Sequence, residues 1–336
     1  MHYTVKEKKV LPKSEYLLII EIPPETVASE ESHVLAQIKK DTELPGFRKG
    51  FVPENILRAR MGEMALFEEA ATHALSEALE EIFRAEKLDV IGRPRVEVLK
   101  LVPGNTAEFR VALSLYPQLL LPDYKKIAKE HAGKKIEVTD IEEKEIDTVI
   151  AEIKKHRETT TGKKDSEITD DSVKEFGPFK TVADFRAKVK DGLTERKTEK
   201  HREKRRAELL DRLTDKSRGE IPNVLIESEL SRMESELRSE IERMGASFDG
   251  YLKEIKKSQE EMRKEWYNDA EKRVRLQLML VQIARSEKIA VPEEQIEKEM
   301  RYIIEHYKNA DAKNARSYVE TFFTNQKVLQ FLETQK

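Results

Sequence analysis

The chain has no cysteine in its 336 residues, and it has only 12 glycines, 12 prolines and one tryptophan. Without cysteine, disulfide scaffolds, thiolate catalysis and cysteine-ligated zinc sites are excluded. Charged residues make up 38% of the chain, so the scarcity of turn-forming residues favours long solvated helices over a compact enzyme. No run approaches the roughly 18 apolar residues of a membrane span, and the N-terminus lacks a secretory signal. These absences predict a soluble cytoplasmic protein with no membrane contact.

The formal net charge is −3, so any attraction to nucleic acid requires a local basic patch, and we expect no direct DNA binding. The strongest candidate is residues 196–206, which hold seven Lys or Arg and two Glu. This stretch could be an RNA-binding helix. It could equally be a solvated helix, because Arg196 and Glu199, and Lys200 and Glu203, have the i,i+3 spacing of local ion pairs. Charge runs on helices usually face water, which favours the second interpretation.

The first third of the chain mixes strand and helix patterns. Predicted strands cover 3–11, 15–22, 94–102 and 107–116, and predicted helices cover 26–40, a segment beginning near Pro53, and 63–86. The helix over 63–86 has the clearest apolar stripe, with a hydrophobic residue every three or four positions. This order predicts an α+β domain over 1–116, an antiparallel sheet covered by helices.

The remainder of the chain is predicted to be helical. Residues 117–172 read as an extended connector, a helix over 140–157 and a polar junction at 159–172. Later predicted helices cover 181–216, 223–244, 258–287, a segment after Pro292, and 314–333. We expect residues 173–336 to form an elongated all-α domain with protruding helical arms, so the protein is mostly helical overall.

A short loop at residues 45–53 carries the most distinctive pattern. Gly46 and Gly50 permit sharp turns, and between them stand Phe47, Arg48 and Lys49, with no acidic residue. An exposed aromatic ring beside two cations is a small docking element, which can stack and reach phosphates or carboxylates. The alternative is an ordinary connection whose Phe47 packs into the local core.

The same loop resembles the signature of trigger factor, the bacterial chaperone at the ribosomal exit tunnel. The family pattern Gly-Phe-Arg-x-Gly followed by Pro is matched at Gly46, Phe47, Arg48, Gly50 and Pro53. The family often has lysine where this chain has phenylalanine, directly after Gly50, a departure that removes one cation from the loop. The turn Ile-Gly-Arg-Pro at 91–94 is also similar to the family.

The C-terminal half resembles the helical chaperone domain of the same family. The likeness rests on Phe-Gly-Pro-Phe from Phe176, Thr-Val-Ala-Asp-Phe-Arg from Thr181, Ile-Pro-Asn-Val-Leu-Ile-Glu from Ile221, and Ile-Ala-Val-Pro-Glu-Glu from Ile289. These motifs follow the family's order, so the resemblance covers nearly all of the chain.

The resemblance implies a function. It implies an ATP-independent chaperone that binds the large ribosomal subunit near the exit tunnel and shields nascent or unfolded polypeptides, with possible homodimers when free. It also implies that Gly46, Phe47, Arg48, Lys49, Gly50 and Pro53 form the ribosome-binding loop.

The helical half supplies candidate client-binding residues. Most apolar residues at helical spacing pack inward, but Met and aromatic side chains that face a cradle can repack around many sequences. The candidates are Met233, Leu237, Met244, Phe322 and Phe323.

The sequence gives no sign of catalysis, cofactor or metal binding. The seven histidines are scattered without the i,i+4 pairing of a helical metal site, and no nucleophile or phosphate-loop motif is present. We therefore expect no catalytic residue, no metal and no cofactor. Two other functions stay open, a holdase that works free of ribosomes and an RNA-binding protein that uses residues 196–206.

The prolyl isomerase domain found in most of the family is predicted to be absent, because the polar junction at 159–172 takes its place. Fourteen residues cannot form a sheet with a substrate pocket, so we expect no isomerase activity of the usual kind. A protease-coupled assay of proline-limited refolding measures this. Rates near those of relatives that carry the domain would contradict the expectation.

Overall fold

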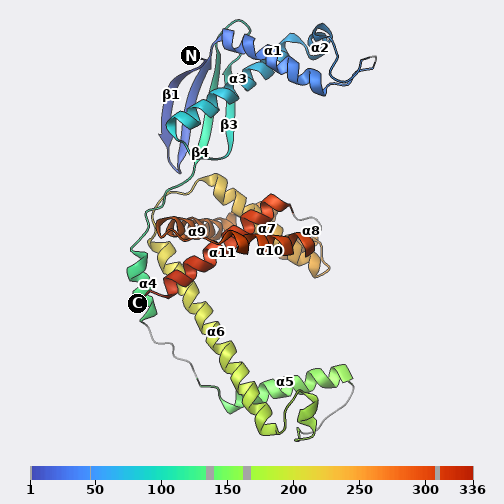
Figure 1. Cartoon of the computed structure of the whole chain (residues 1–336), viewed down its shortest axis with the longest axis vertical. Helices are drawn as coiled ribbons and strands as arrows, with labels where there is room; N and C mark the ends of the chain where they lie inside the picture. Colours follow the sequence, from blue (N-terminus) through green and yellow to red (C-terminus); the bar gives the residue numbers. More distant parts are fainter. Residues whose placement is uncertain (1, 46, 134–139, 162–167, 307–310, 336) are drawn as a thin grey trace. The chain divides into compact units, whose positions relative to one another are not determined.

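The computed structural model describes residues 2–45, 47–133, 140–161, 168–306 and 311–335. The chain forms two compact units. The first unit contains residues 1–120 and 218–278, and the second contains residues 121–217 and 279–336. The fold class is confirmed: a small antiparallel sheet near the N-terminus is followed by many helices (Figure 1).

The first unit contains the sheet and the helices around it. Its strands are β1 (Thr4–Leu11), β2 (Glu15–Ile22), β3 (Val90–Lys100) and β4 (Ala107–Leu115). Its helices are α1 (Pro24–Asp41), α2 (Glu54–Met61), α3 (Glu63–Glu86), α7 (Asn223–Arg243), α8 (Phe248–Ile255) and most of α9 (Gln259–Ser286). The strand order is β1-β2-β4-β3, and every neighbouring pair is antiparallel.

One face of the sheet is buried because apolar residues alternate along its central strands. Leu18 pairs with Val111 and Ile20 with Phe109, and none of these four side chains is more than 1% exposed. The apolar stripe of α3 lies across this face, and α1 packs against α3 (Figure 1). The stripe predicted over 63–86 is confirmed, since nine of its apolar residues are buried along α3.

In the described residues of the second unit, the regular secondary structure is helical. Its elements are α4 (Tyr124–Ala132), α5 (Glu143–Thr161), a 3₁₀ turn (Ser172–Glu175), α6 (Val182–Lys216), α10 (Glu293–His306) and α11 (Ala312–Glu333), with the last part of α9. The rings of Phe176 and Phe179 lie 5.4 and 5.2 Å from the ring of Phe185 and help to form the small core between α5 and α6.

Three expectations about secondary structure were wrong. The connector expected to be extended contains α4, whose N-cap residue Asp123 accepts a hydrogen bond from the Lys126 amide. The strand expected from residue 94 begins at Val90. A helix, α8, was missed: it begins after Ser247, whose hydroxyl accepts from the Gly250 amide, and its eight residues are too few to show a clear period. Part of the polar junction, 162–167, lies outside the described residues.

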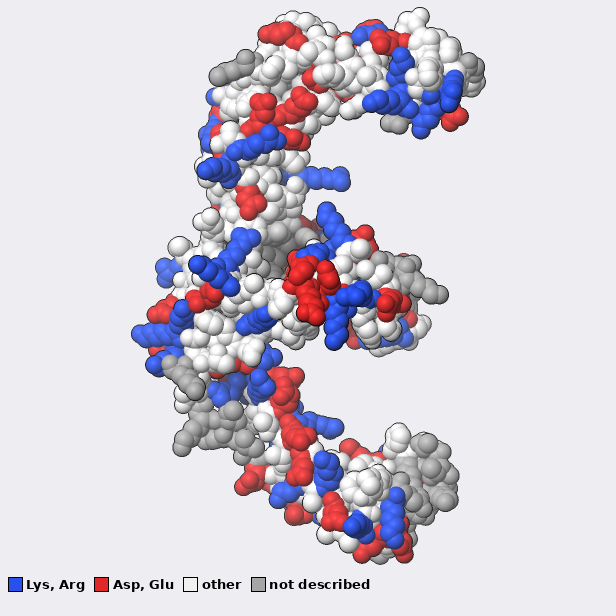
Figure 2. Space-filling view, in the orientation of Figure 1, with Lys and Arg blue, Asp and Glu red and all other residues white. Residues whose placement is uncertain are grey.

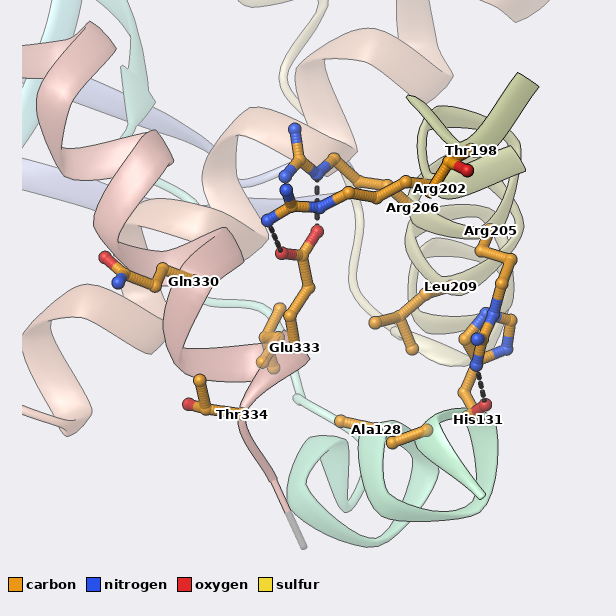
Figure 3. Close-up of a pocket in the computed structure, with 12 residues that line it drawn as sticks. Ala128, His131, Thr198, Arg202, Arg205, Arg206, Leu209, Gln330, Glu333 and Thr334 are labelled. Atoms are coloured by element: carbon orange, nitrogen blue, oxygen red, sulfur yellow. Dashed lines mark hydrogen bonds and ion pairs between the residues drawn. The ribbon is translucent and has the colours of Figure 1, made fainter. Parts of the chain in front are cut away.

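The basic stretch of α6 lies beside a pocket of about 440 Å³ that α4, α6 and α11 enclose (Figure 3). Arg206 Nε lies 2.6 Å from the carboxylate of Glu333 at the end of α11, and Arg202 lies 3.3 Å from it. Arg205 donates a hydrogen bond of 2.7 Å to the His131 carbonyl oxygen. Three cations of the stretch are therefore used to hold α4 and α11 against α6.

The carboxylate of Glu333 has opposing influences on its pKa. Burial alone would raise the pKa, but hydrogen bonds from Arg206 and Arg202 lower it below its ordinary value. A lowered folded-state pKa means that this carboxylate stabilises the fold above its unfolded-state pKa of about 4.3. The contribution is lost as pH falls through the lower, folded-state pKa.

Glu333→Gln should lower the free energy of unfolding of the second unit by about 1–2 kcal/mol at pH 7, because the two guanidinium groups lose their counter-charge. The difference from wild type should shrink as the pH falls below the ordinary carboxylate pKa and should be lost as it passes through the lower folded-state pKa of Glu333. Thermal unfolding at several pH values measures both effects. Glu208→Gln on the exposed side of α6 is the control, and an equal effect of the two substitutions would contradict the assignment.

Candidate functional site

The loop between α1 and α2 is fixed at both ends. Thr42 closes α1, since its amide and its hydroxyl both donate to the Ile38 carbonyl oxygen, at 2.8 and 2.7 Å. Leu44 packs against the core of the first unit, and Val52 is fully buried in it. Pro53 is the N-cap residue of α2, with an extended backbone that suits its fixed φ. The loop is therefore held by apolar side chains eight residues apart.

Two backbone turns shape the segment between these anchors. The Phe47 amide donates to the Leu44 carbonyl oxygen at 3.0 Å, and the Phe51 amide donates to the Arg48 carbonyl oxygen at 2.9 Å. The second turn needs Gly50, whose φ of +84° is a conformation that side chains other than glycine rarely adopt. Gly46 lies outside the described residues.

The turns leave the aromatic and basic side chains of the loop accessible. Phe47 is 37% exposed and Phe51 is 69% exposed, and Arg48 and Lys49 are exposed too. Neither cation forms an ion pair with any other residue that the structure describes, whereas many of the chain's other Lys and Arg do. Phe47 is therefore not a core residue, and the two positive charges are not neutralised within the first unit.

In the sequence, Phe51 stands where the family often has a lysine, which indicates only the loss of a positive charge. The structure gives this ring a contact of its own. The guanidinium of Arg48 lies 5.9 Å from the centroid of the Phe51 ring, within the range of a cation–π contact. This contact holds an exposed ring against an exposed charge, so the loop presents two aromatic side chains. Figure 2 shows Lys and Arg side chains gathered at the end of the first unit that carries α2 and this loop.

The candidate client residues of the first unit differ in exposure. Met233 is buried at 9% exposure and Leu237 is half-buried, and both line a shallow depression of about 520 Å³ with Trp266 between α7 and α9. Met244, which follows α7, is 71% exposed. Only Met244 offers a large free apolar surface in this conformation.

The candidate client residues of the second unit lie on α11. Phe322 is 45% exposed, and Phe323 is half-buried with its ring 5.4 Å from that of Phe322. Tyr318, which sequence reasoning missed, is 65% exposed and stacks on Phe322 at 6.3 Å. Its signal in the sequence was the i,i+4 spacing from Phe322, which places both rings on one side of the helix.

The remaining titratable groups show no catalytic arrangement within the described part of the chain. The local ion pairs expected at Arg196–Glu199 and Lys200–Glu203 are not formed in the structure of residues 182–216. That stretch instead pairs with other elements: Lys197 Nζ lies 2.7 Å from Glu145 of α5, and two arginines reach α11. In the described ranges, no helix is both long enough and apolar enough to cross a membrane.

Gly50→Ala should destabilise the loop by about 1–2 kcal/mol through backbone strain alone, because an added Cβ would meet no atom within 4 Å. Gly50→Asn should cost less, since asparagine tolerates positive φ. Hydrogen exchange of the Phe51 amide measures the local opening. Equal protection in all three proteins would mean that the turn is not formed in solution.

Two family models match the chain. One, described as bacterial trigger factor protein, matches residues 2–153, and the other, the bacterial trigger factor C-terminus, matches residues 181–333. Only residues 154–180 lie between the two matches, so the family's isomerase domain is absent from this chain.

Related proteins agree with these matches. The trigger factor of Halothermothrix orenii is 24% identical, with 88% of this chain and 89% of the relative covered. The trigger factor of Halalkalibacterium halodurans is 21% identical, with 91% of each covered. The first alignment spans 382 positions, more than the 336 residues of this chain, so the relative has additional residues.

A solved structure from work on promiscuous substrate recognition by the trigger factor chaperone shares the fold. Its TM-score is 0.53 and its identity 19%, with 98% of this chain and 99% of that chain covered. The two family models together cover nearly the whole chain, in the order N-terminal then C-terminal. The chain therefore belongs to the trigger factor family, in a form that lacks the prolyl isomerase domain.

Proposed function

We propose that this protein is an ATP-independent cytoplasmic chaperone that docks on the large ribosomal subunit near the exit tunnel and shields nascent chains. The observation that carries the docking step is the loop between α1 and α2. It presents two exposed rings and two cations without internal counter-ions among the described residues, on a backbone anchored at Leu44 and Val52. Family membership supports a chaperone role.

The chemistry of the loop suits a surface that combines phosphate and protein. Arg48 and Lys49 can each contact a phosphate oxygen or a carboxylate, and an arginine can do so through two parallel hydrogen bonds. Phe47 adds apolar area at the centre of the contact, where binding energy is usually concentrated. We propose that residues 1–116 dock, residues 117–172 link, and residues 173–336 bind clients.

Client shielding is proposed to work through many weak apolar contacts. Met244 is on the first unit and the Tyr318–Phe322 pair on the second, and each leaves a large apolar side chain in water. An unfolded client that covers these side chains removes apolar area from water, and release follows when the client buries the same groups in its own core. Free molecules could also pair as homodimers through such surfaces.

Replacing Phe47, Arg48 and Lys49 together by Ala should reduce co-sedimentation with bacterial ribosomes by at least about tenfold in affinity, because the central ring and both charges are lost. The matched control replaces Arg93, Val96 and Lys100 by Ala. This set also has one apolar and two basic side chains, is exposed, and lies on β3 of the same unit.

The outcomes separate the proposal from its rivals. Loss of ribosome binding in the loop variant alone supports docking through the loop. Equal binding of wild type and both variants would contradict it, and absence of binding by wild type would favour a ribosome-independent holdase. Strong salt-dependent binding to free RNA that is lost on neutralising residues 196–206 would favour the RNA-binding alternative.

Replacing Met244 and Phe322 by Ser should weaken the suppression of aggregation of a diluted, chemically unfolded client protein, because two exposed apolar groups are removed. The Met244 substitution is expected to leave stability nearly unchanged, since that side chain is 71% exposed. The Phe322 substitution also removes ring contacts with Tyr318 and Phe323, so thermal unfolding of the variant is measured alongside. Light scattering in the absence of ribosomes measures the effect. Replacing the exposed Val10 and Leu120 by Ser is the control, and an equal loss of protection would contradict the assignment.

A further inference from the structure

A group of metal-ligating side chains lies where α1 and α3 pack together, outside the docking loop and the client surfaces. Glu30 of α1 and His73 and Glu77 of α3 each place one potential ligand atom within 4.8 Å of the other two. Glu30 Oε2 lies 2.8 Å from His73 Nδ1, and His73 Nδ1 lies 3.9 Å from Glu77 Oε1. His33 Nδ1 is 3.3 Å from the same oxygen of Glu30.

Glu30 is unusual because it is a carboxylate in the core of the helix pair. It is 6% exposed, one of the few buried charged residues in the described part of the chain. Its ion-pair partners there are two histidines, and no Lys or Arg is recorded beside it. A buried carboxylate is costly unless a positive charge or several hydrogen bonds compensate it.

The contact between Glu30 and His73 is close but is not a hydrogen bond. The Nδ1 atom of His73 is buried and has no hydrogen-bond partner in the described structure, although Glu30 Oε2 is only 2.8 Å away. The same two atoms can both be satisfied by one cation between them.

The donor set and its spacing fit a first-row divalent cation. Imidazole nitrogen and carboxylate oxygen bind zinc at about 2.0–2.2 Å, so two ligands of a tetrahedral ion lie roughly 3.4 Å apart. The observed separations of 2.8 and 3.9 Å bracket that distance. Glu77 is 62% exposed at its side chain, so the cluster opens to solvent on one side and an ion can enter. His73 and Glu77 are four residues apart on one helix, which places both on the same face.

We propose that Glu30, His73 and Glu77 form a binding site for a divalent transition-metal ion of the zinc class. The ion would compensate the buried carboxylate and connect α1 to α3 across their interface. Because α1 leads directly into the docking loop, occupancy of the site would stabilise the helix pair that supports the loop. The sequence did not indicate this site, since its ligands come from two helices and include only one histidine.

Calorimetric titration of the metal-free full-length chain with zinc chloride at pH 7.5 tests the proposal. We expect one saturable site, and at least about a tenfold loss of affinity in His73→Asn and in Glu77→Gln. Glu30→Gln should lose affinity as well, but its burial makes folding of the variant uncertain, so the two more accessible positions decide the outcome.

Two control variants and a spectroscopic measurement complete the test. His201→Asn on α6 and Glu69→Gln on the exposed side of α3 should bind zinc within twofold of wild type. Cobalt(II) in place of zinc should give ligand-field absorption bands in wild type and both controls, and these bands should be lost in His73→Asn. Absence of saturable binding in wild type, or equal affinity in all variants, would overturn the proposal.

Discussion

The packing of Leu44 and Val52 against the core of the first unit is the constraint on which the loop at residues 45–53 depends. These two side chains fix the ends of the segment 44–52 against the core of the first unit, and Phe47, Arg48, Lys49 and Phe51 between them are exposed. Gly50 then reverses the backbone where another residue would be strained, and Arg48 lies against Phe51.

The distribution of counter-charges separates positions that hold the fold together from positions that are free to bind. In α6, basic side chains whose pattern could indicate nucleic-acid binding instead form ion pairs with Glu333 and Glu145 and a hydrogen bond to a backbone carbonyl. In the loop at residues 45–53, Arg48 and Lys49 have no ion-pair partner within the described ranges. The ion-pair partners distinguish the cations that hold helices together from the cations that are left without a counter-charge.

The same reasoning explains why the cluster at Glu30 stands out. Nearly all other acidic side chains are solvated or face Lys or Arg, and a solvated carboxylate requires no partner. Glu30 is desolvated by the packing of α1 on α3, and the residues that approach it are histidines. The same helix pair, α1 and α3, buries Glu30 and supports the loop that begins after α1.

Local patterns determined much of this protein. The strand pairs, the α3 stripe, the long α6 and the docking loop with its glycines are readable from residue spacing, because each depends on neighbours within a few positions. Tertiary structure decided the rest. Three contacts depend on residues from different turns or helices coming together. They are Arg48 with the exposed ring of Phe51, Glu333 with Arg202 and Arg206, and Glu30 with His73. A sequence pattern specifies which face of an element is apolar, but it does not specify which other element covers that face.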